Sequence, residues 1–230
     1  MKISKTNALK SRADLNYMAK NNFPDRVFIT GTDSGVGKTT VAAILMAGLP
    51  NSGYWKPLQS GAEELTDSQW ICKVTGLSET RFYPETYRLK APLPPHASAA
   101  MENVTIDLNQ FWVPYLGSLE RLIVEGVGGV MVPLNENHFM LDLMSRLNYP
   151  VILVCKNGRG AINNTLLTLE QLRNQGLNIL GVVLNGPSVA SNRTAIERYG
   201  KVRIMAELPV LEQVNPKTLA QAYEDYFTLE

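Results

Sequence analysis

The chain has 230 residues, of which 45% are hydrophobic and 19% are charged. This length suits one α/β domain, and so apolar a composition excludes a disordered chain and predicts a large core. Lys and Arg number 22 and Asp and Glu 21, leaving a formal net charge of +1. A dedicated nucleic-acid-binding protein would normally carry a basic excess, so we expect no nucleic-acid partner.

The sequence gives no sign of a membrane span or a secreted scaffold. The longest apolar runs have about ten residues, well short of the roughly 20 that cross a bilayer. The N-terminus is polar and lacks the apolar core of a secretory signal. Cys72 and Cys155 are too few for a disulfide framework and lack metal-ligand spacing. We therefore expect a cytoplasmic protein with no membrane partner.

Residues 1–24 differ from the rest of the chain, because they are polar and carry scattered basic side chains. A short helix over 13–19 is compatible with them, but they hold no recognisable chemistry, and we interpret them as an N-terminal extension. Residues 25–230 are interpreted as one domain. The proline-rich stretch 91–95 is a loop within it rather than a linker, because strand-like segments continue afterwards.

Strands and helices begin to alternate at residue 26. A β-rich run over 26–30 leads into a glycine-rich turn and then a helix over 38–49. A short strand is predicted over 53–58. A further helix is predicted over 65–75, with Gly76 at its C-cap.

The second half of the chain continues the alternation. Apolar strands are predicted over 122–125, 151–155 and 179–185, and helices over 139–148 and 162–175. Such apolar strands are typical of a parallel sheet that is buried on both faces. Their alternation with helices indicates βαβ units, so the predicted fold is α/β, with one doubly wound, mainly parallel sheet.

The strongest functional signal is the segment Gly31–Thr39 (GTDSGVGKT), a glycine-rich loop between a strand and a helix. In a P-loop the backbone N–H groups and the helix N-terminus attract phosphate. Lys38 is placed to reach β- and γ-phosphate oxygens, and the Thr39 hydroxyl to ligate Mg²⁺. The strict motif would have glycine where this chain has Thr32. We expect a P-loop NTPase-like single domain.

Three other polar residues are candidates for the same site. Glu125 ends an apolar run before a glycine-rich turn and resembles a Walker B acid, although apolar strands often end in an acid. Asp67 lies at a predicted helix start, where a capping role is the alternative. Lys56 ends a predicted strand at the sheet edge where ligands bind, or is a solvated surface lysine. Residues 59–61 are interpreted as a tight, polar turn beside it that faces a ligand.

Together these segments resemble the dethiobiotin synthetase family, the ATP-dependent enzymes of biotin synthesis. The resemblance extends from about Arg26 to Ala220. Besides the glycine-rich loop, it is carried by Lys56-Pro57, Ser60-Gly61, Asp67, Pro95-His96, Glu125-Gly126, Gly128-Gly129, Gly160, Ile162-Asn163 and Asn185.

The resemblance implies a role for each matching residue. Lys38 and Lys56 would be catalytic and would hold the phosphates and the charge that develops on transfer. The implied Mg²⁺ ligands are Thr39, Asp67 and Glu125. The implied ATP site comprises Gly35, Val36, Gly37, Lys38, Thr39, Thr40, Asn185, Pro209 and Leu211, with Asn185 at the adenine. The implied substrate site comprises Ser34, Lys56, Ser60, Gly128, Gly160, Ala161 and Asn163, the last three from the neighbouring subunit of a homodimer.

The implied reaction uses ATP, CO₂ or bicarbonate, and 7,8-diaminopelargonate. One amine forms a carbamate, the carbamate oxygen attacks the γ-phosphate, and the second amine closes a ureido ring as phosphate leaves. The protein would contribute positioning and charge stabilisation rather than a strong base. We therefore interpret His96 as a structural residue. Gly35 stands where the family often has an acid.

Two other classes of protein stay open at this point. A ParA/MinD-like switch ATPase acting through a protein or membrane partner would usually have a lysine early in the loop, where this chain has residues 32–34 (TDS). It would also favour a basic amphipathic C-terminal helix, whereas residues 221–230 are acidic. The synthetase part of a cobyrinate-type amidotransferase would need a glutaminase domain, for which the chain is too short.

Overall fold

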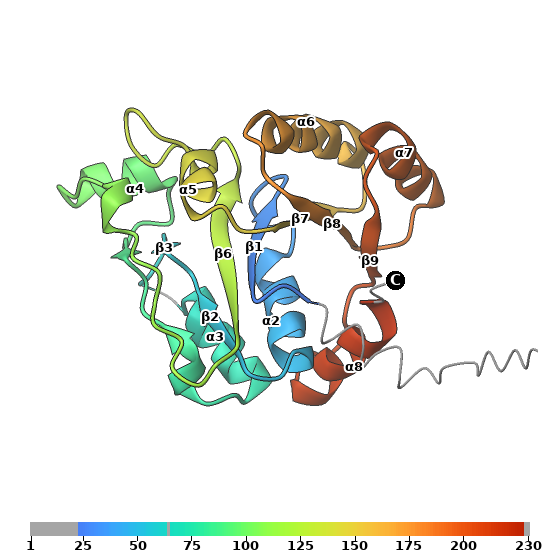
Figure 1. Cartoon of the computed structure of the whole chain (residues 1–230), viewed down its shortest axis with the longest axis horizontal. Coiled ribbons are helices and arrows are strands. Elements are labelled where there is room, and N and C mark those ends of the chain that lie inside the picture. Colours follow the sequence, from blue (N-terminus) through green and yellow to red (C-terminus); the bar gives the residue numbers. More distant parts are fainter. Residues whose placement is uncertain (1–22, 64, 228–230) are drawn as a thin grey trace, which may run out of the picture.

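A computed structural model describes residues 23–63 and 65–227 of the protein (Figure 1). The helix considered over 13–19 lies outside these residues. Within the described part, seven strands form one sheet in the order β4-β2-β6-β1-β7-β8-β9, and all neighbouring strands are parallel. The strands are β1 (Arg26–Gly31), β2 (Ser52–Trp55), β4 (Phe82–Tyr83), β6 (Arg121–Gly129), β7 (Val151–Lys156), β8 (Ile179–Asn185) and β9 (Ile204–Leu208).

Helices cover both faces of this sheet (Figure 1). One face carries α2 (Lys38–Gly48), α3 (Asp67–Thr75) and α8 (Pro216–Tyr226). The other carries α5 (Met140–Leu147), α6 (Ala161–Asn174) and α7 (Ala190–Gly200). Smaller elements lie near the β4 edge, namely β3 (Leu58–Gln59) paired with β5 (Tyr87–Arg88), α4 (Pro95–Met101) and the 3₁₀ turns η1 (Glu79–Arg81) and η2 (Leu108–Gln110).

The apolar strands divide their side chains between two cores. On β1, Phe28 packs with the α5–α7 side, whereas Ile29 packs with α2 and α8. On β6, Ile123 packs in the same core as Ile29, whereas its neighbours Leu122 and Val124 pack in the core on the α5–α7 side. This period of two buries both faces of each central strand. The predicted doubly wound parallel fold is therefore confirmed.

Two predicted strand boundaries are wrong. The strand expected over 53–58 is interrupted, because β2 ends at Trp55 and Leu58 begins the separate strand β3. The strand expected to end at Glu125 continues to Gly129, since its pairing with β1 runs on to the Gly31–Gly129 register. Glu125 therefore lies within β6 rather than at its end.

The helices of the described residues include none that is both long and apolar enough to span a bilayer.

Candidate active site

The glycine-rich loop joins β1 to α2 and contacts the last residue of β8, Asn185. Gly35 and Gly37 have φ angles of 66° and 103°, which glycine adopts without the steric cost that a side chain brings. A Cβ at Gly37 would also lie 2.1 Å from the amide nitrogen of Asn185. That amide donates a hydrogen bond to the Val36 carbonyl at 2.9 Å. The end of β8 thus fixes the conformation of the loop.

Lys38 begins α2 and folds back over the loop. Its ammonium donates to the Asp33 carbonyl at 2.9 Å, and the residue is only 7% exposed. Burial lowers the pKa of Lys38 to about 8, although the charge of Glu125 opposes the shift. A partly desolvated ammonium with one neutral acceptor gains strongly from an anionic ligand.

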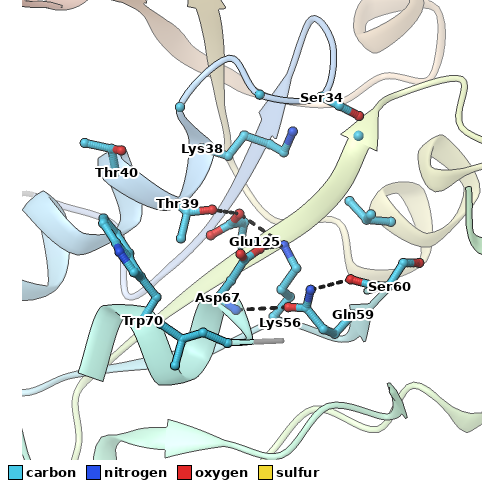
Figure 2. A pocket seen from close by; sticks show the side chains of 15 residues that line it. Ser34, Lys38, Thr39, Thr40, Lys56, Gln59, Ser60, Asp67, Trp70 and Glu125 are labelled. Atoms are coloured by element: carbon cyan, nitrogen blue, oxygen red, sulfur yellow. Dashed lines mark hydrogen bonds and ion pairs between the residues drawn. The ribbon is translucent and has the colours of Figure 1, made fainter. Parts of the chain in front are cut away.

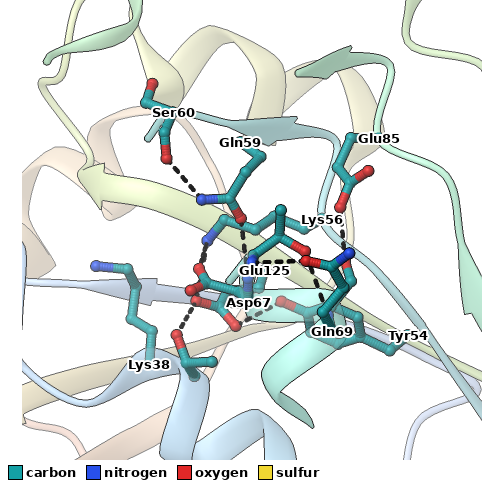
Figure 3. Close-up of polar contacts among 12 residues, drawn as sticks. Lys38, Tyr54, Lys56, Gln59, Ser60, Asp67, Gln69, Glu85 and Glu125 are labelled. Atoms are coloured by element: carbon teal, nitrogen blue, oxygen red, sulfur yellow. Dashed lines mark hydrogen bonds and ion pairs between the residues drawn. The ribbon is translucent and has the colours of Figure 1, made fainter. Parts of the chain in front are cut away.

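Glu125 accepts hydrogen bonds at both carboxylate oxygens (Figure 3). Oε1 accepts from the Thr39 hydroxyl at 2.8 Å and from the Lys56 ammonium at 3.1 Å. Oε2 accepts from the Tyr54 hydroxyl at 2.8 Å. Burial and the charge of Glu125 raise the pKa of Tyr54 well above its usual value, so this phenol stays protonated and acts as the donor. Three elements, β2, α2 and β6, therefore meet at one carboxylate.

Lys56 is a bridge between two acids and not a surface lysine. Its ammonium contacts Asp67 as well as Glu125, and the side chain is 3% exposed. Burial alone would lower the pKa of Lys56, but the charges of Glu125 and Asp67 outweigh burial and raise it. Lys56 therefore carries its positive charge in the centre of the site.

Asp67 lies in the first turn of α3, where the helix dipole favours an acid. The cap itself is Thr66, which forms a capping box with Gln69. The Asp67 N–H donates to the Gln59 side chain at 3.1 Å, and Gln59 donates to the Ser60 carbonyl at 2.6 Å. The carboxylate of Asp67 therefore does not cap the helix, and it forms an ion pair with Lys56.

A cleft of about 580 Å³ collects most of the expected site residues (Figure 2). Those lining it are Ser34, Gly35, Gly37, Lys38, Thr39, Thr40, Lys56, Ser60, Asp67, Glu125 and Gly128. A second cavity of about 290 Å³ lies beside the loop at the ends of β8 and β9. Asn185, Pro209 and Leu211 line this second cavity. Gly35 and Thr40 line both, so the two cavities meet at the phosphate loop.

Some expected site residues lie elsewhere. Gly160, Ala161 and Asn163, at the start of α6, line neither of these two cavities in the described structure. The Val36 side chain is buried in the core, so only its backbone is placed to contact a ligand of the loop. His96 is exposed on α4 and also lines neither cavity.

Five residues that line the cleft or contact its acids are not among the expected site residues, namely Tyr54, Gln59, Leu65, Trp70 and Val127. Tyr54 precedes Lys56 by two residues, a spacing that places both side chains on one face of an extended chain. This spacing is the sequence feature from which Tyr54 could have been predicted to lie at the site. Trp70 follows Asp67 by three residues, which places both on one helix face in the cleft. Gln59 contacts Asp67 and belongs to the polar turn 59–61, which the sequence predicts to face a ligand.

The donor set suits magnesium. Thr39, Asp67 and Glu125 offer a hydroxyl and two carboxylates, which are the oxygen ligands of a hard cation. No group of three or more His, Cys, Asp or Glu side chains placed to hold a metal occurs among the described residues. A hydroxyl and two carboxylates are fewer oxygen ligands than Mg²⁺ takes, so a cation held there would need further ligands from outside the protein.

Comparison with known proteins identifies the family. Residues 25–218 match the family AAA_26, described as an AAA domain. The ATP-dependent dethiobiotin synthetase BioD of Paramagnetospirillum magneticum is 44% identical over 202 residues, which are 88% of this chain and 96% of that protein. The chain belongs to the dethiobiotin synthetase family. The BioD of Agrobacterium fabrum is 42% identical over 204 residues, 89% of this chain and 95% of that protein.

One relative of the family is larger. The biotin biosynthesis bifunctional protein BioCD of Bordetella avium is 43% identical over 197 residues. These are 85% of this chain but 42% of that protein, so this chain spans less than half of the bifunctional relative.

Solved structures with the same fold are more distant. A ParA family ATPase from Chlorobium tepidum has a TM-score of 0.52 at 11% identity, covering 87% of this chain and 96% of that one. The Pyrococcus furiosus cell division ATPase MinD has a TM-score of 0.51 at 17% identity, with the same coverage. At such identities the likeness shows the fold alone, and it does not favour a switch ATPase over the synthetase family.

Proposed function

We propose that this protein forms dethiobiotin from 7,8-diaminopelargonate, CO₂ and ATP, as a ring-closing ligase. The observation that carries the proposal is the meeting of Lys38, Lys56 and Glu125 in one cleft of a dethiobiotin synthetase family member. The two lysines would stabilise the charge of a transferred phosphoryl group, and the acid would hold a metal ion beside it. We assign this activity to residues 25–230 and no role to residues 1–24.

ATP would lie along the phosphate loop. The loop N–H groups and Lys38 would hold the β- and γ-phosphates, and Thr40 would lie between the two cavities. The adenine would occupy the smaller cavity, lined by Asn185 and by Pro209–Leu211. The amide nitrogen of Asn185 is engaged by the loop, which leaves its oxygen for the adenine amino group.

Thr39, Asp67 and Glu125 would hold Mg²⁺. When bound, the ion would neutralise phosphate charge and polarise the transferred group. The Thr39 hydroxyl donates its proton to Glu125, so its lone pairs stay free for a cation. Lys56 contributes a second positive charge that both acids hold in position.

The diamine would lie at the far end of the cleft. A cavity of about 330 Å³ there is lined by Ser34, Ser60 and Gly128 together with the prolines at 92, 94 and 95. The Ser60 hydroxyl is buried and has no protein partner in the described structure, so it is available to a ligand. Polar groups beside an apolar wall suit a diamine on an aliphatic chain.

The chemistry then needs few protein groups. One substrate amine adds CO₂ and loses a proton to become a carbamate, whose oxygen attacks the γ-phosphate and releases ADP. The second amine attacks the resulting carbamic–phosphoric anhydride, closing the ureido ring and releasing phosphate. Lys38 and Lys56 would stabilise the negative charge on the phosphoryl oxygens as it shifts.

ADP release tests this function directly. We expect slow release with ATP and Mg²⁺ alone, and much faster release when the diamine and bicarbonate are added together. Each addition alone should have little effect, because the carbamate is the nucleophile. ATP use that ignores the diamine but responds to a protein, DNA or membrane partner would support a switch ATPase instead.

A homodimer would complete the substrate site. Gly160 is the N-cap of α6 and has a left-handed conformation without a side-chain cap, so the first N–H groups of the helix suit a carboxylate. We propose that this turn, with Ala161 and Asn163, reaches the substrate tail in the neighbouring subunit.

Sedimentation velocity should therefore give a dimer at assay concentration. Asn163→Ala should raise KM for the diamine and leave KM for ATP unchanged, whereas Asn174→Ala at the other end of α6 should change neither. A stable monomer with full activity would contradict the shared site.

We place the protein in the cytoplasm, because Cys72 and Cys155 are free thiols. Its proposed partners are small molecules and a second copy of the chain, without nucleic acid or membrane.

A further inference from the structure

Tyr54 brings a hydroxyl from the core to the acid at the centre of the site (Figure 3). The residue lies on β2 and is fully buried. Its ring packs against Phe82 with 6.0 Å between the ring centroids, and its hydroxyl donates to Glu125 Oε2 at 2.8 Å. The ring therefore belongs to the core, whereas the hydroxyl belongs to the site.

The two oxygens of Glu125 have different surroundings. Oε1 accepts from Thr39 and Lys56, which both line the cleft, whereas Oε2 accepts from Tyr54, which does not. A buried carboxylate can only accept hydrogen bonds, and an oxygen without a donor costs free energy. The Tyr54 hydroxyl satisfies Oε2 on the core side and so fixes the rotation of the carboxylate about its last torsion.

The packing of the Tyr54 ring in the core does not require its hydroxyl. Trp55, the next residue, turns to the opposite core and donates its indole N–H to the Pro84 carbonyl. Phenylalanine at position 54 would keep the ring contact with Phe82 and leave Oε2 without its donor. The hydroxyl is thus separable from the packing of the ring.

We propose that Tyr54 is a positioning residue, whose hydrogen bond to Oε2 holds Glu125 with Oε1 turned to the divalent cation of a nucleotide complex. This inference rests on the metal role proposed above for Glu125. Residues that orient a metal ligand commonly change metal affinity by about 10- to 100-fold when they are replaced.

The test measures ADP binding by calorimetry, with Mg²⁺ and with a chelator. Tyr54→Phe should weaken Mg²⁺-dependent ADP binding by about 10-fold or more and leave metal-free ADP binding unchanged. In turnover, the apparent KM for Mg²⁺ should rise while kcat at saturating Mg²⁺ is largely kept. If Tyr54 only stabilised the fold, its replacement would weaken ADP binding with and without Mg²⁺ alike.

Tyr87→Phe is the matched control. The Tyr87 hydroxyl also makes a hydrogen bond, from the Asp107 N–H at 2.9 Å, but it lies outside the cleft. This variant should bind Mg²⁺ and ADP as the wild type does. Melting temperatures of both Phe variants show whether each is folded at the temperature of the assay.

Glu125→Gln, alone and combined with Tyr54→Phe, tests whether Tyr54 acts through Glu125. If Tyr54 acts through Glu125, Tyr54→Phe should have no further effect on Mg²⁺ affinity once Glu125 is Gln. Wild-type Mg²⁺ affinity in Tyr54→Phe, with a loss in Glu125→Gln, would overturn the positioning role and leave the proposed function standing. Wild-type Mg²⁺ affinity in Glu125→Gln would overturn both the metal role of Glu125 and this inference.

Discussion

Dethiobiotin formation should fall by about 10²–10³ when Glu125 is replaced by Gln. The amide keeps the shape of the side chain but removes the negative charge that would hold Mg²⁺ against the phosphates. It also offers one acceptor oxygen, where the carboxylate serves three donors, Thr39, Tyr54 and Lys56. We expect the variant to fold, since Lys56 retains Asp67 as an ionic partner.

The measurement is product formation at saturating substrates, with circular dichroism to check the fold. Glu197→Gln is a suitable control, because Glu197 is a partly exposed residue of α7 paired only with Arg193 among the contacts of the described structure. It should leave the rate unchanged. Normal turnover by Glu125→Gln would remove this acid from the metal site.

Lys38→Ala should lower kcat/KM for ATP by about 10²–10³, with both a higher KM and a lower kcat. Lys38 is buried at the loop and donates to a single neutral carbonyl, that of Asp33. Phosphate oxygens would therefore be its strongest partners in both the bound state and the transition state. Truncation should remove this contact from both states.

Lys217→Ala tests whether the effect belongs to the site or to net charge. Lys217 is an exposed residue in the first turn of α8, so its loss should not alter ATP kinetics. Steady-state rates over a range of ATP concentrations give both constants. An unchanged KM for ATP in Lys38→Ala would exclude Lys38 from phosphate binding.

Most of the central fold could be predicted from local patterns. The apolar runs at 151–155 and 179–185 match β7 and β8 almost residue for residue, because a strand buried on both faces is apolar throughout. The glycine-rich loop is equally local, since its glycines, lysine and threonine all lie within residues 31–39. Strands β4 and β5 could not be predicted, because two residues show no periodicity.

The extent of β6 depended on its partner. The glycines after Glu125 predict a turn by their local preference, yet they continue β6 because β1 pairs alongside them as far as Gly31. Pairing with a neighbouring strand thus overrode the local preference. Glu125 therefore lies in the interior of β6 rather than at its end.

The sequence alone determined the class of fold and the phosphate loop, and the family resemblance added the two lysines and two acids that line the cleft. Only the tertiary structure decided how they meet. Tyr54 and Glu125 are 71 positions apart, and Val36 and Asn185 are 149 apart, yet each pair is joined by a hydrogen bond. These contacts follow from the strand order, in which β6 lies between β2 and β1 although more than sixty residues separate it from either in the chain. Hydrogen bonds act over about 3 Å, so they report neighbours in space, and no local pattern encodes which distant strands become neighbours.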